Sequence, residues 1–312
     1  GTGKTDAEAL WIKRGGTLVG GSGNWTAGSV VGDNHANCKF TLTSGTITVN
    51  GHSADSTRPL ILGGTSTHTA AHGGGTIVIT YGGGAYNLSN YATTSLNNLT
   101  LNSNVTATIS SPSIVMAGNL TISQGTLDTD SSNDRTLTVN GGVEIASAGA
   151  LDLNNSVTTI KSLKCNAGTV TAPSSAAFTI FDETSGFALY LLGNYTFNHS
   201  NGLVHIDHSS HNSDTFVQWG AGSNQPLYDF KYTAFDADNK CEWYGYDNHL
   251  KCDRDLTIVE GVFARISGRA GDTMTVERNV SVESGGRGFN YKHKRPCTYS
   301  RRRCKCNRNT YG

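Results

Sequence analysis

Hydrophobic and polar residues alternate along this chain in short runs that recur about every two dozen residues. The clearest copies are residues 119–127 (NLTISQGTL) and 255–263 (DLTIVEGVF). Alternation with a period of two is typical of a β-strand with one buried and one exposed face. Self-similarity at a fixed spacing of roughly 20 to 50 residues predicts a repeat architecture, in which each unit buries its apolar side against its neighbours.

A glycine closes each run and makes the spacing measurable. A first group consists of Gly125, Gly149 and Gly168, and a second group of Gly261 and Gly285. Within each group the interval is about 19 to 24 residues, the range of a short structural repeat. Asn104 occupies the equivalent place in the run before Gly125. Because glycine and, less readily, asparagine tolerate positive φ, we expect a left-handed backbone conformation at these positions.

The remaining runs extend the strand pattern over most of the chain. They include residues 40–43, 46–49, 76–81 and 136–139, separated by Gly, Asn, Asp and Ser. No window carries an apolar stripe at helical spacing, so we expect very little helix. A propeller blade needs about 40 to 50 residues. The shorter units of this chain instead predict an all-β fold, a parallel β-helix (single-stranded β-solenoid) with one unit per coil.

Changes of pattern divide the chain into five predicted segments. They are an irregular N-terminal or capping segment (1–37), β-solenoid coils (38–177), an aromatic-rich segment of wider coils or an insertion (178–254), further coils (255–286), and an aberrant basic, cysteine-rich tail (287–312).

Composition narrows the possible partners. The chain has 312 residues, 15% of them charged, with a formal net charge of zero. This balance predicts no nucleic-acid partner and no attraction to an anionic membrane. No apolar run approaches the roughly 20 residues of a membrane span, and the N-terminus lacks the pattern of a signal peptide. The chain begins with Gly rather than Met, which is consistent with a fragment or a processed product.

The tail departs from every trend above. Residues 287–312 contain nine of the 24 Lys and Arg and three of the seven Cys. Three interpretations stand beside one another: a nucleic-acid arm, a metal site with Cys297, Cys304 and Cys306 as ligands, or an unstructured basic extension.

A reading-frame slip is a fourth interpretation and the one that we favour. If the tail is back-translated and read one nucleotide downstream, permitted codons from Cys297 onward spell ALTVAGDVNVTGTLTG. This string has the form of residues 136–145 (TLTVNGGVEI). We therefore expect the tail to be a frameshift product, so that the true C-terminus differs. Resequencing the DNA beyond the codon for Gly286 tests this, and finding no frame that continues the repeat would refute it.

Two polar clusters have the residue types of metal sites. His205, Asp207 and His208 combine imidazole and carboxylate ligands for a divalent metal. Asp128, Asp130 and Asp134 offer alternating oxygen ligands for calcium, although the central Gly and closing Glu of an EF-hand are missing. In both clusters the alternative is an ordinary solvated turn. We expect no other cofactor.

The internal cysteines offer one candidate disulfide. Cys241 and Cys252 lie close together in the sequence, but sequence alone does not supply the geometry of a bond between them.

Residues 178–243 contain 13 of the 26 aromatic side chains of the chain. They fit either a larger core or a glycan-binding surface, since sugar rings stack on exposed aromatic faces. For the second interpretation the candidate ligand-binding residues are Trp219, Tyr228, Trp243 and Tyr244.

Runs such as residues 118–128 (GNLTISQGTLD) and 137–143 (LTVNGGV) resemble those of right-handed parallel β-helix proteins in tailed-phage virions. They are also similar to bacterial surface adhesins and autotransporter passengers. The resemblance covers roughly residues 90–290. It implies a right-handed coil and an extended, often trimeric, structural protein of a virion or a cell surface. It brings no catalytic residue with it.

We therefore expect a non-enzymatic structural or adhesive β-solenoid, tail-fibre- or tailspike-like, that self-associates and contacts host surface polysaccharide. We expect it in a virion or at the extracellular surface. The alternatives are a bacterial surface adhesin and a polysaccharide lyase or glycosidase on the same scaffold. An enzyme would need grouped carboxylates. The plausible pool is Asp207, Asp214, Asp236, Asp238 and Glu242.

Overall fold

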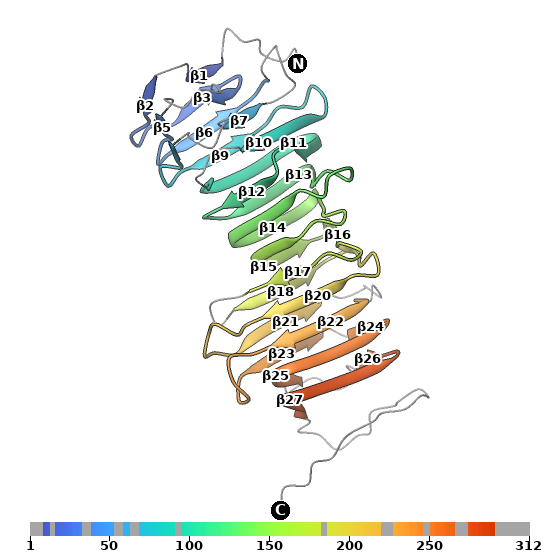
Figure 1. Cartoon of the computed structure of the whole chain (residues 1–312). Coiled ribbons are helices and arrows are strands. Elements are labelled where there is room, and N and C mark those ends of the chain that lie inside the picture. The colour runs from blue at the N-terminus through green and yellow to red at the C-terminus, as the bar shows by residue number, and fades with distance from the viewer. Residues whose placement is uncertain are drawn as a thin grey trace, which may run out of the picture.

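The computed structural model describes residues 9–12, 16–32, 39–52, 59–62, 69–90, 95–181, 186–219, 227–245, 250–265 and 274–290. The predicted fold is confirmed: the described residues contain strands and no helices, and the strands stack as a right-handed parallel β-solenoid of about nine turns. Figure 1 shows the coils stacked from the N-terminal to the C-terminal end of an elongated molecule. Among the described residues there is no helix with the length and apolarity that crossing a membrane requires.

The N-terminal coils are built from short strands. These are β1 (Leu10–Ile12), β2 (Thr17–Val19), β3 (Trp25–Ala27), β4 (Val30–Gly32), β5 (Lys39–Thr41), β6 (Thr46–Val49), β7 (Leu60–Leu62), β8 (Thr69–Ala71), β9 (Thr76–Ile79) and β10 (Tyr86–Asn90). Four of them, β1 to β4, lie in the segment predicted to be irregular. β3 pairs with β6, and β4 with β7, in the register of the later coils. Strands of three residues are too short for their alternation to be recognised in the sequence.

The middle coils contain longer strands, several of which turn a corner without interruption. They are β11 (Asn98–Ile109), β12 (Ser113–Met116), β13 (Leu120–Asp128), β14 (Thr136–Asp152), β15 (Thr158–Asn166), β16 (Thr169–Thr171) and β17 (Phe178–Ile180). They contain the repeat of residues 119–127, whereas its copy at residues 255–263 lies in a C-terminal strand.

The C-terminal coils follow the same order. They comprise β18 (Phe187–Leu192), β19 (Thr196–Asn198), β20 (Leu203–Asp207), β21 (Thr215–Trp219), β22 (Asp229–Thr233), β23 (Lys240–Gly245), β24 (Leu250–Cys252), β25 (Asp255–Arg265), β26 (Met274–Val276) and β27 (Asn279–Asn290). β27 extends to Asn290 and pairs with β25 there, so residues 287–290 of the predicted aberrant tail still belong to a coil. The rest of the tail lies outside the described residues.

Parallel pairing places equivalent apolar residues one above another. The longest such column consists of Ile47, Ile77, Leu99, Leu120, Val143, Leu163, Leu189, Val217 and Trp243. Each of these side chains is at most 4% exposed. Burial of one such side chain contributes about 1.5–3 kcal/mol, so the columns rather than any single contact hold the coils together.

The coils widen in the aromatic-rich segment. Leu99 aligns with Leu120 on the next coil, and Leu189 aligns with Val217, so the later coil contains more residues than the earlier one. Phe178, Phe230 and Tyr232 fill the added interior and are at most 1% exposed.

The closing glycines serve two different purposes. Gly125 has φ of +78°, as expected, and a Cβ there would lie 2.0 Å from the carbonyl oxygen of Ser103. Gly149 and Asn104 do not have positive φ, contrary to the prediction. At Gly149 a Cβ would lie 2.3 Å from the carbonyl oxygen of Ile122, so close approach of neighbouring coils requires this glycine.

Candidate functional site

Three aromatic side chains form a cluster on the outer face of the wide coils. Phe187 and Tyr190 extend from β18 and Phe216 from β21, and all three are half-buried. The ring centroids of Phe187 lie 4.7 Å from Tyr190 and 5.7 Å from Phe216. These are the tilted arrangements and distances that aromatic pairs prefer. We call these three residues the outer aromatic cluster.

The local sequence explains why these rings face outward. A register irregularity between Phe187 and Leu189 interrupts the alternation, so that Ala188 and Leu189 are both buried and Phe187 is not. Beyond it, Tyr190 lies between the buried Leu189 and Leu191. Gln218 is the register neighbour of Tyr190 and is only 4% exposed, so the outer face around it is well packed.

Carboxylates border the outer aromatic cluster where two adjacent coils turn a corner. Glu242 on β23 is the register partner of Phe216. Asp214 precedes β21, and its Oδ1 accepts a hydrogen bond from the backbone N–H of Lys240 (2.8 Å). Asp236 and Asp238 lie in the turn between β22 and β23, where Asp236 Oδ1 accepts from the backbone N–H of Asp238 (2.9 Å). We call Asp214, Asp236, Asp238 and Glu242 the acidic corner.

Electrostatic coupling links Glu242 with Asp214 and Lys240. Partial burial raises the pKa of Glu242, the carboxylate of Asp214 raises it further, and the ammonium of Lys240 opposes both. The Lys240 Nζ lies 3.8 Å from Asp214 Oδ2. Lys240 therefore compensates Asp214 more directly than it compensates Glu242.

Buried polar groups lie beneath the acidic corner. His208 is fully buried, and its Nε2 lies 2.9 Å from Ser213 Oγ. The Nδ1 of His211 and the hydroxyl of Tyr232 are buried without a hydrogen-bond partner. Burial raises the pKa of Tyr232 far above its ordinary value, and the charges of Cys241, Asp214 and Asp236 add to the effect. The phenol of Tyr232 belongs to the buried interior of the coils.

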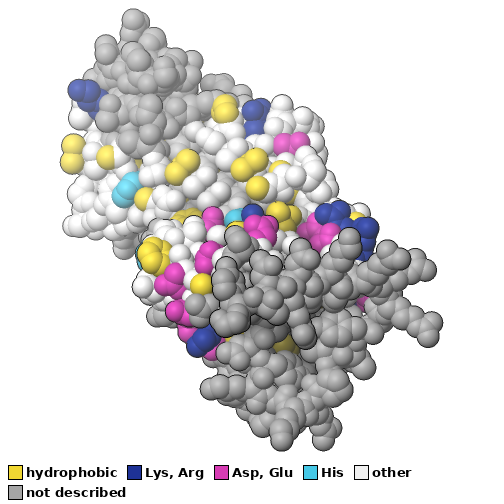
Figure 2. Space-filling view, turned by 60° about the horizontal axis from the view of Figure 1, so that its bottom comes forward, with side chains coloured by type: hydrophobic (Ala, Val, Ile, Leu, Met, Phe, Trp, Pro, Cys, Tyr) yellow, Lys and Arg dark blue, Asp and Glu magenta, His cyan; other side chains and the backbone are white. Residues whose placement is uncertain are grey.

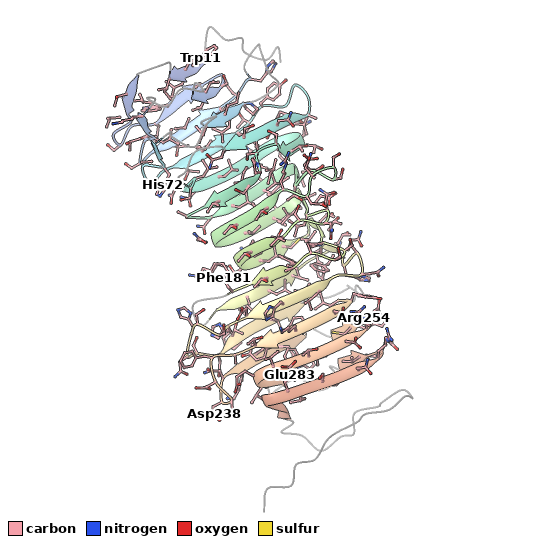
Figure 3. The ribbon with its side chains drawn as sticks, in the orientation of Figure 1. Trp11, His72, Phe181, Asp238, Arg254 and Glu283 are labelled. Carbon is pink, nitrogen blue, oxygen red and sulfur yellow. The ribbon has the colours of Figure 1, made fainter. Side chains whose placement is uncertain are left out.

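The opposite edge of the solenoid has a different character. Figure 3 places Phe181 and Asp238 along one edge and Arg254 along the other. There the ring of Tyr228 stacks on His199, with centroids 5.4 Å apart, and the guanidinium of Arg254 lies 4.8 Å from the Tyr228 centroid. Arg254 also donates through Nε (2.7 Å) and Nη2 to the carboxylate of Asp229, which is 8% exposed. This network joins three coils.

The structure changes the set of aromatic candidates for ligand binding. Trp243 belongs to the core column and is 4% exposed, so it offers no face to a ligand. Tyr228 is half-buried, and its ring contacts His199 and the guanidinium of Arg254. Trp219 pairs with Gly245, and Tyr244 is the register partner of Gln218, but the side chains of both lie outside the described residues.

The candidate metal ligands of β20 point in different directions. His205 and Asp207 are outward on the strand, whereas His208 is buried. His205 Nε2 lies 2.9 Å from Thr233 Oγ1, and Asp207 Oδ1 accepts from Ser209 Oγ (2.6 Å). Burial lowers the pKa of His205 and its register neighbour Lys231 lowers it further, while Asp207 opposes the shift. A neighbouring ammonium is unfavourable for a bound cation.

The carboxylates of the candidate calcium ligands accept hydrogen bonds from residues of the surrounding turns. Asp128 Oδ1 accepts from Asn154 Nδ2 (2.8 Å), and Asp134 Oδ1 accepts from the backbone N–H of Asn155 (3.1 Å). Asp130 Oδ2 accepts from Asn133 Nδ2 (2.7 Å), a contact that lowers the pKa of Asp130. Within the described part of the chain, no three His, Cys, Asp or Glu side chains are grouped so as to hold a metal ion.

The candidate disulfide is not formed. Cys252 is a free, buried thiol, so it is not bonded to Cys241. Cys165 is likewise buried in the core, as its inward strand position predicted.

Of the carboxylates that the sequence offered for catalysis, the structure places Asp214 and Glu242 near one another on adjacent coils, Asp236 and Asp238 in the turn before β23, and Asp207 on the outer face of β20. The sequence left a larger core and a glycan-binding surface open for this segment, and Phe187, Tyr190 and Phe216 were not among the residues predicted to bind a ligand. The run FALYLL around them gave no sign of the irregularity that turns Phe187 outward. Comparison of the chain with protein-family models, curated proteins and solved structures finds no match.

Proposed function

We propose that this protein is a non-enzymatic structural and adhesive β-solenoid, a tail-associated component of a phage virion that provides a rigid shaft and binds surface glycans. The resemblance of its repeats to tailed-phage β-helix proteins supports the placement in a virion. A shaft requires a stiff rod, and the parallel ladder supplies one, since 22 strands form a single hydrogen-bonded sheet.

The surface of the middle coils suits a shaft rather than an active site. Its outward strand positions are mostly small and uncharged, for example Thr100, Thr121 and Thr138. The charges of Glu144 and Lys164 neutralise one another in an exposed ion pair (2.7 Å). Such a surface offers few groups for acid–base or nucleophilic chemistry.

The outer aromatic cluster is the observation that carries the adhesive part of the proposal. Phe187, Tyr190 and Phe216 present adjacent rings on a rigid sheet, and the carboxylate of Glu242 borders them. Aromatic faces beside a hydrogen-bond acceptor are the elements that a sugar-binding surface needs, because the rings pack on apolar C–H faces while polar groups bind hydroxyls.

Binding of host surface polysaccharide to immobilised protein tests this function. We expect Tyr190→Ala and Phe216→Ala to weaken binding about tenfold each, the loss expected for an aromatic contact of about 1.5 kcal/mol. Trp11→Ala is the matched control, since Trp11 is an exposed aromatic (37%) at the other end of the molecule. Equal binding by all three variants would refute the assignment of the cluster, and no binding by the parent protein would refute the adhesive function.

Glycan hydrolysis is a second candidate function, favoured by Asp214 and Glu242. Asp214 faces Lys240, so Glu242 lies one strand across and two residues along, about 8 Å away between Cα atoms for ordinary strand dimensions. The general acid of a glycosidase needs a raised pKa, the direction found for Glu242. In that role Glu242 would protonate the glycosidic oxygen and Asp214 would activate water.

Release of reducing ends from a polysaccharide panel distinguishes the two functions. Hydrolysis abolished by Glu242→Gln and by Asp214→Asn would establish the enzyme and refute the non-enzymatic proposal. Binding without release of reducing ends would support it. Lyase activity would appear instead as unsaturated products.

The location and assembly of the protein are part of the same proposal. We expect a virion component that self-associates, with a homotrimer as the expected assembly, and a bacterial surface adhesin as the alternative. Tail or capsid genes beside the source gene would support the virion, and a secretion or anchoring system there would favour the adhesin. Light scattering on the purified chain measures the oligomeric state.

A further inference from the structure

We propose that the C-terminal end of the solenoid core is an interaction surface for one further coil, and that residues 297–312 encode this coil in the reading frame one nucleotide downstream. The reading-frame slip was inferred from the sequence alone, and the structure adds the surface on which the restored residues fit. This surface consists of Val276, Val280 and Val282, on the strands β26 and β27 that end the stack of coils (Figure 1). We call it the open core end.

The exposure of an interior column is the first observation. One core column runs through Ile206, Tyr232 and Ile258, each of which is 0% exposed. Its next member, Val282, is 44% exposed. Exposure of an apolar residue at a position that is buried in every preceding coil indicates that the surface is made to be covered, because burial of apolar area is the main stabilising term.

Two neighbouring columns end in the same way. Leu256 is fully buried and its register partner Val280 is half-buried, and Cys252 is fully buried whereas its partner Val276 is half-buried. Among the described strands, β26 pairs with β24 alone and β27 with β25 alone. Figure 2 shows acidic side chains gathered in the half of the described surface toward the C-terminal end, so an apolar surface here differs from its surroundings.

A ladder of side-chain hydrogen bonds leads to the same end. Asp229 Oδ1 accepts from the backbone N–H of Asp255 (3.2 Å), and Asp255 Oδ1 accepts from the backbone N–H of Asn279 (3.1 Å). Asn98 and Asn119 are linked in this way in the middle coils (2.8 Å). We therefore expect Asn279 Oδ1 to accept from the first residue of a strand stacked on β27. Parallel pairing also directs alternate backbone groups of β27 toward the next coil.

The genetic code supplies residues that suit this surface. In the downstream frame the codons of Cys304 and Cys306 specify only Val or Ala, and the codon of Lys305 between them specifies only Asn or Ser, whichever synonymous codon is used. The two apolar positions lie 24 residues after Val280 and Val282. The same interval separates paired residues of β25 and β27, so the coded strand would stack on β27 in register.

Other positions of the restored coil continue this register. The string LTVAGDVNV aligns without a gap with residues 250–258 (LKCDRDLTI) and 274–282 (MTVERNVSV). All three carry apolar residues at the first, third, seventh and ninth positions and Asp or Asn at the sixth. The third, seventh and ninth positions are those of the open core end, and the sixth is that of the ladder. A second copy of this chain at the same surface would not explain why the downstream frame repeats the pattern.

Hydrogen exchange compares two full chains, the present one and a frame-restored chain in which residues 1–296 are followed by ALTVAGDVNVTGTLTG. We expect exchange of alternate amides in β26 and β27 to slow at least about tenfold in the frame-restored chain, because the stacked coil accepts their hydrogen bonds. Exchange in β13 and β14 should be equal in the two chains and shows that the solenoid is folded in both.

Substitutions in the restored coil locate the contact. Aspartate at both valines of its DVNV run would place charges against the open core end, and should return exchange in β26 and β27 to the rates of the present chain. Aspartate at the asparagine between these valines adds a charge on the outward face and should keep the protection.

Thiol labelling gives an independent measurement. After Val282→Cys, we expect iodoacetamide to react at this position at least about tenfold more slowly in the frame-restored chain than in the present one, because the added coil covers it. Val157→Cys is the matched control, since Val157 is exposed (51%) on the middle coils and should react equally in both chains.

Each contrary outcome overturns the inference. Equal exchange in β26 and β27 of the two chains would do so, as would full protection in the variant with two aspartates. Loss of protection in β13 and β14 on restoring the frame would do so as well, because a coil that fits the open core end does not unfold the coils beneath it. Protection of β27 that rises with the concentration of the present chain would show that a second copy covers this end instead. None of these results bears on glycan binding by the outer aromatic cluster.

Discussion

Replacement of Gly125 by Ala tests the reason for the glycine that closes each repeat. Gly125 combines φ of +78° with two backbone contacts, since a Cβ would lie 2.0 Å from the carbonyl oxygen of Ser103 and 2.5 Å from that of Val105. Gly21 offers a matched comparison, because its φ is +62° and nothing lies within 4 Å of the added Cβ. The two substitutions therefore share the backbone strain and differ in the steric clash.

The magnitudes follow from these two terms. Left-handed φ costs a residue with a Cβ about 1–2 kcal/mol, and the lower entropy of the unfolded alanine chain offsets about 0.4–1 kcal/mol of this. Gly21→Ala should thus destabilise by about 1 kcal/mol or less. Gly125→Ala adds the cost of moving packed backbone, about 1–3 kcal/mol by analogy with overpacked cores, so that its total is about 2–4 kcal/mol.

Hydrogen exchange is the suitable assay, because repeat arrays unfold locally and need not show a single two-state transition. Gly125→Ala should accelerate exchange of amides in β11 and β13, which pair on either side of the contact, and leave β25 and β27 unchanged. If Gly125→Ala and Gly21→Ala lower the free energy of local opening equally, close approach of the coils is not the reason for Gly125.

The remaining predictions concern buried polar groups and a buried thiol. Tyr86→Phe should lower the free energy of unfolding by about 1 kcal/mol, because it removes a buried hydrogen bond to the Ser103 hydroxyl (3.0 Å). Tyr232→Phe should be neutral or stabilising, because the hydroxyl of Tyr232 has no hydrogen-bond partner. Urea denaturation of the two variants and the parent protein measures these differences. Burial raises the pKa of Tyr86 from 10.0 to about 12, so the stability associated with this neutral phenol is complete below about pH 10 and is lost as the pH rises toward 12. Alkaline denaturation should therefore show a smaller loss of stability in Tyr86→Phe than in the parent protein. Asp229→Asn should cost about 1.5–3 kcal/mol in chemical denaturation, because Arg254 loses its charged acceptor, and an unchanged midpoint would contradict this. Burial raises the pKa of the Cys165 thiol to about 11, so iodoacetamide should leave Cys165 unlabelled at pH 8 in the folded protein and label it after denaturation, as mass spectrometry of the peptides would show.

The fold was readable from the sequence because one physical rule operates in every coil. Each strand must bury alternate residues, so Leu120 and Ile122 repeat as Leu256 and Ile258. Parallel hydrogen bonding then stacks each coil directly on the next, so that equivalent apolar residues align in columns. The sequence pattern did not predict β1 to β4, because strands of three residues contain too few alternating positions to recognise.

The candidate site was less predictable because it arises where the rule is interrupted. A single register irregularity beside Phe187 decides which of several adjacent aromatic residues face outward, and no residue type marks it. Trp243 was expected at a ligand face, but the column that contains Val217 draws it into the core. The acidic corner could be named from composition, yet only the pairing of β21 with β23 places Glu242 beside Phe216.

Because equivalent residues align from one coil to the next, the length of this molecule can change without a change in the structure of each coil. Each coil adds one strand spacing, about 4.8 Å, to the axis, and neighbouring middle coils such as those of Leu99 and Leu120 are of similar width. Duplication or deletion of a whole coil between Leu99 and Val143 would therefore change the reach of the rod in fixed steps and leave the outer aromatic cluster unaltered. The number of coils thus sets the length of the rod, and selection can change this length without altering the residues at either end.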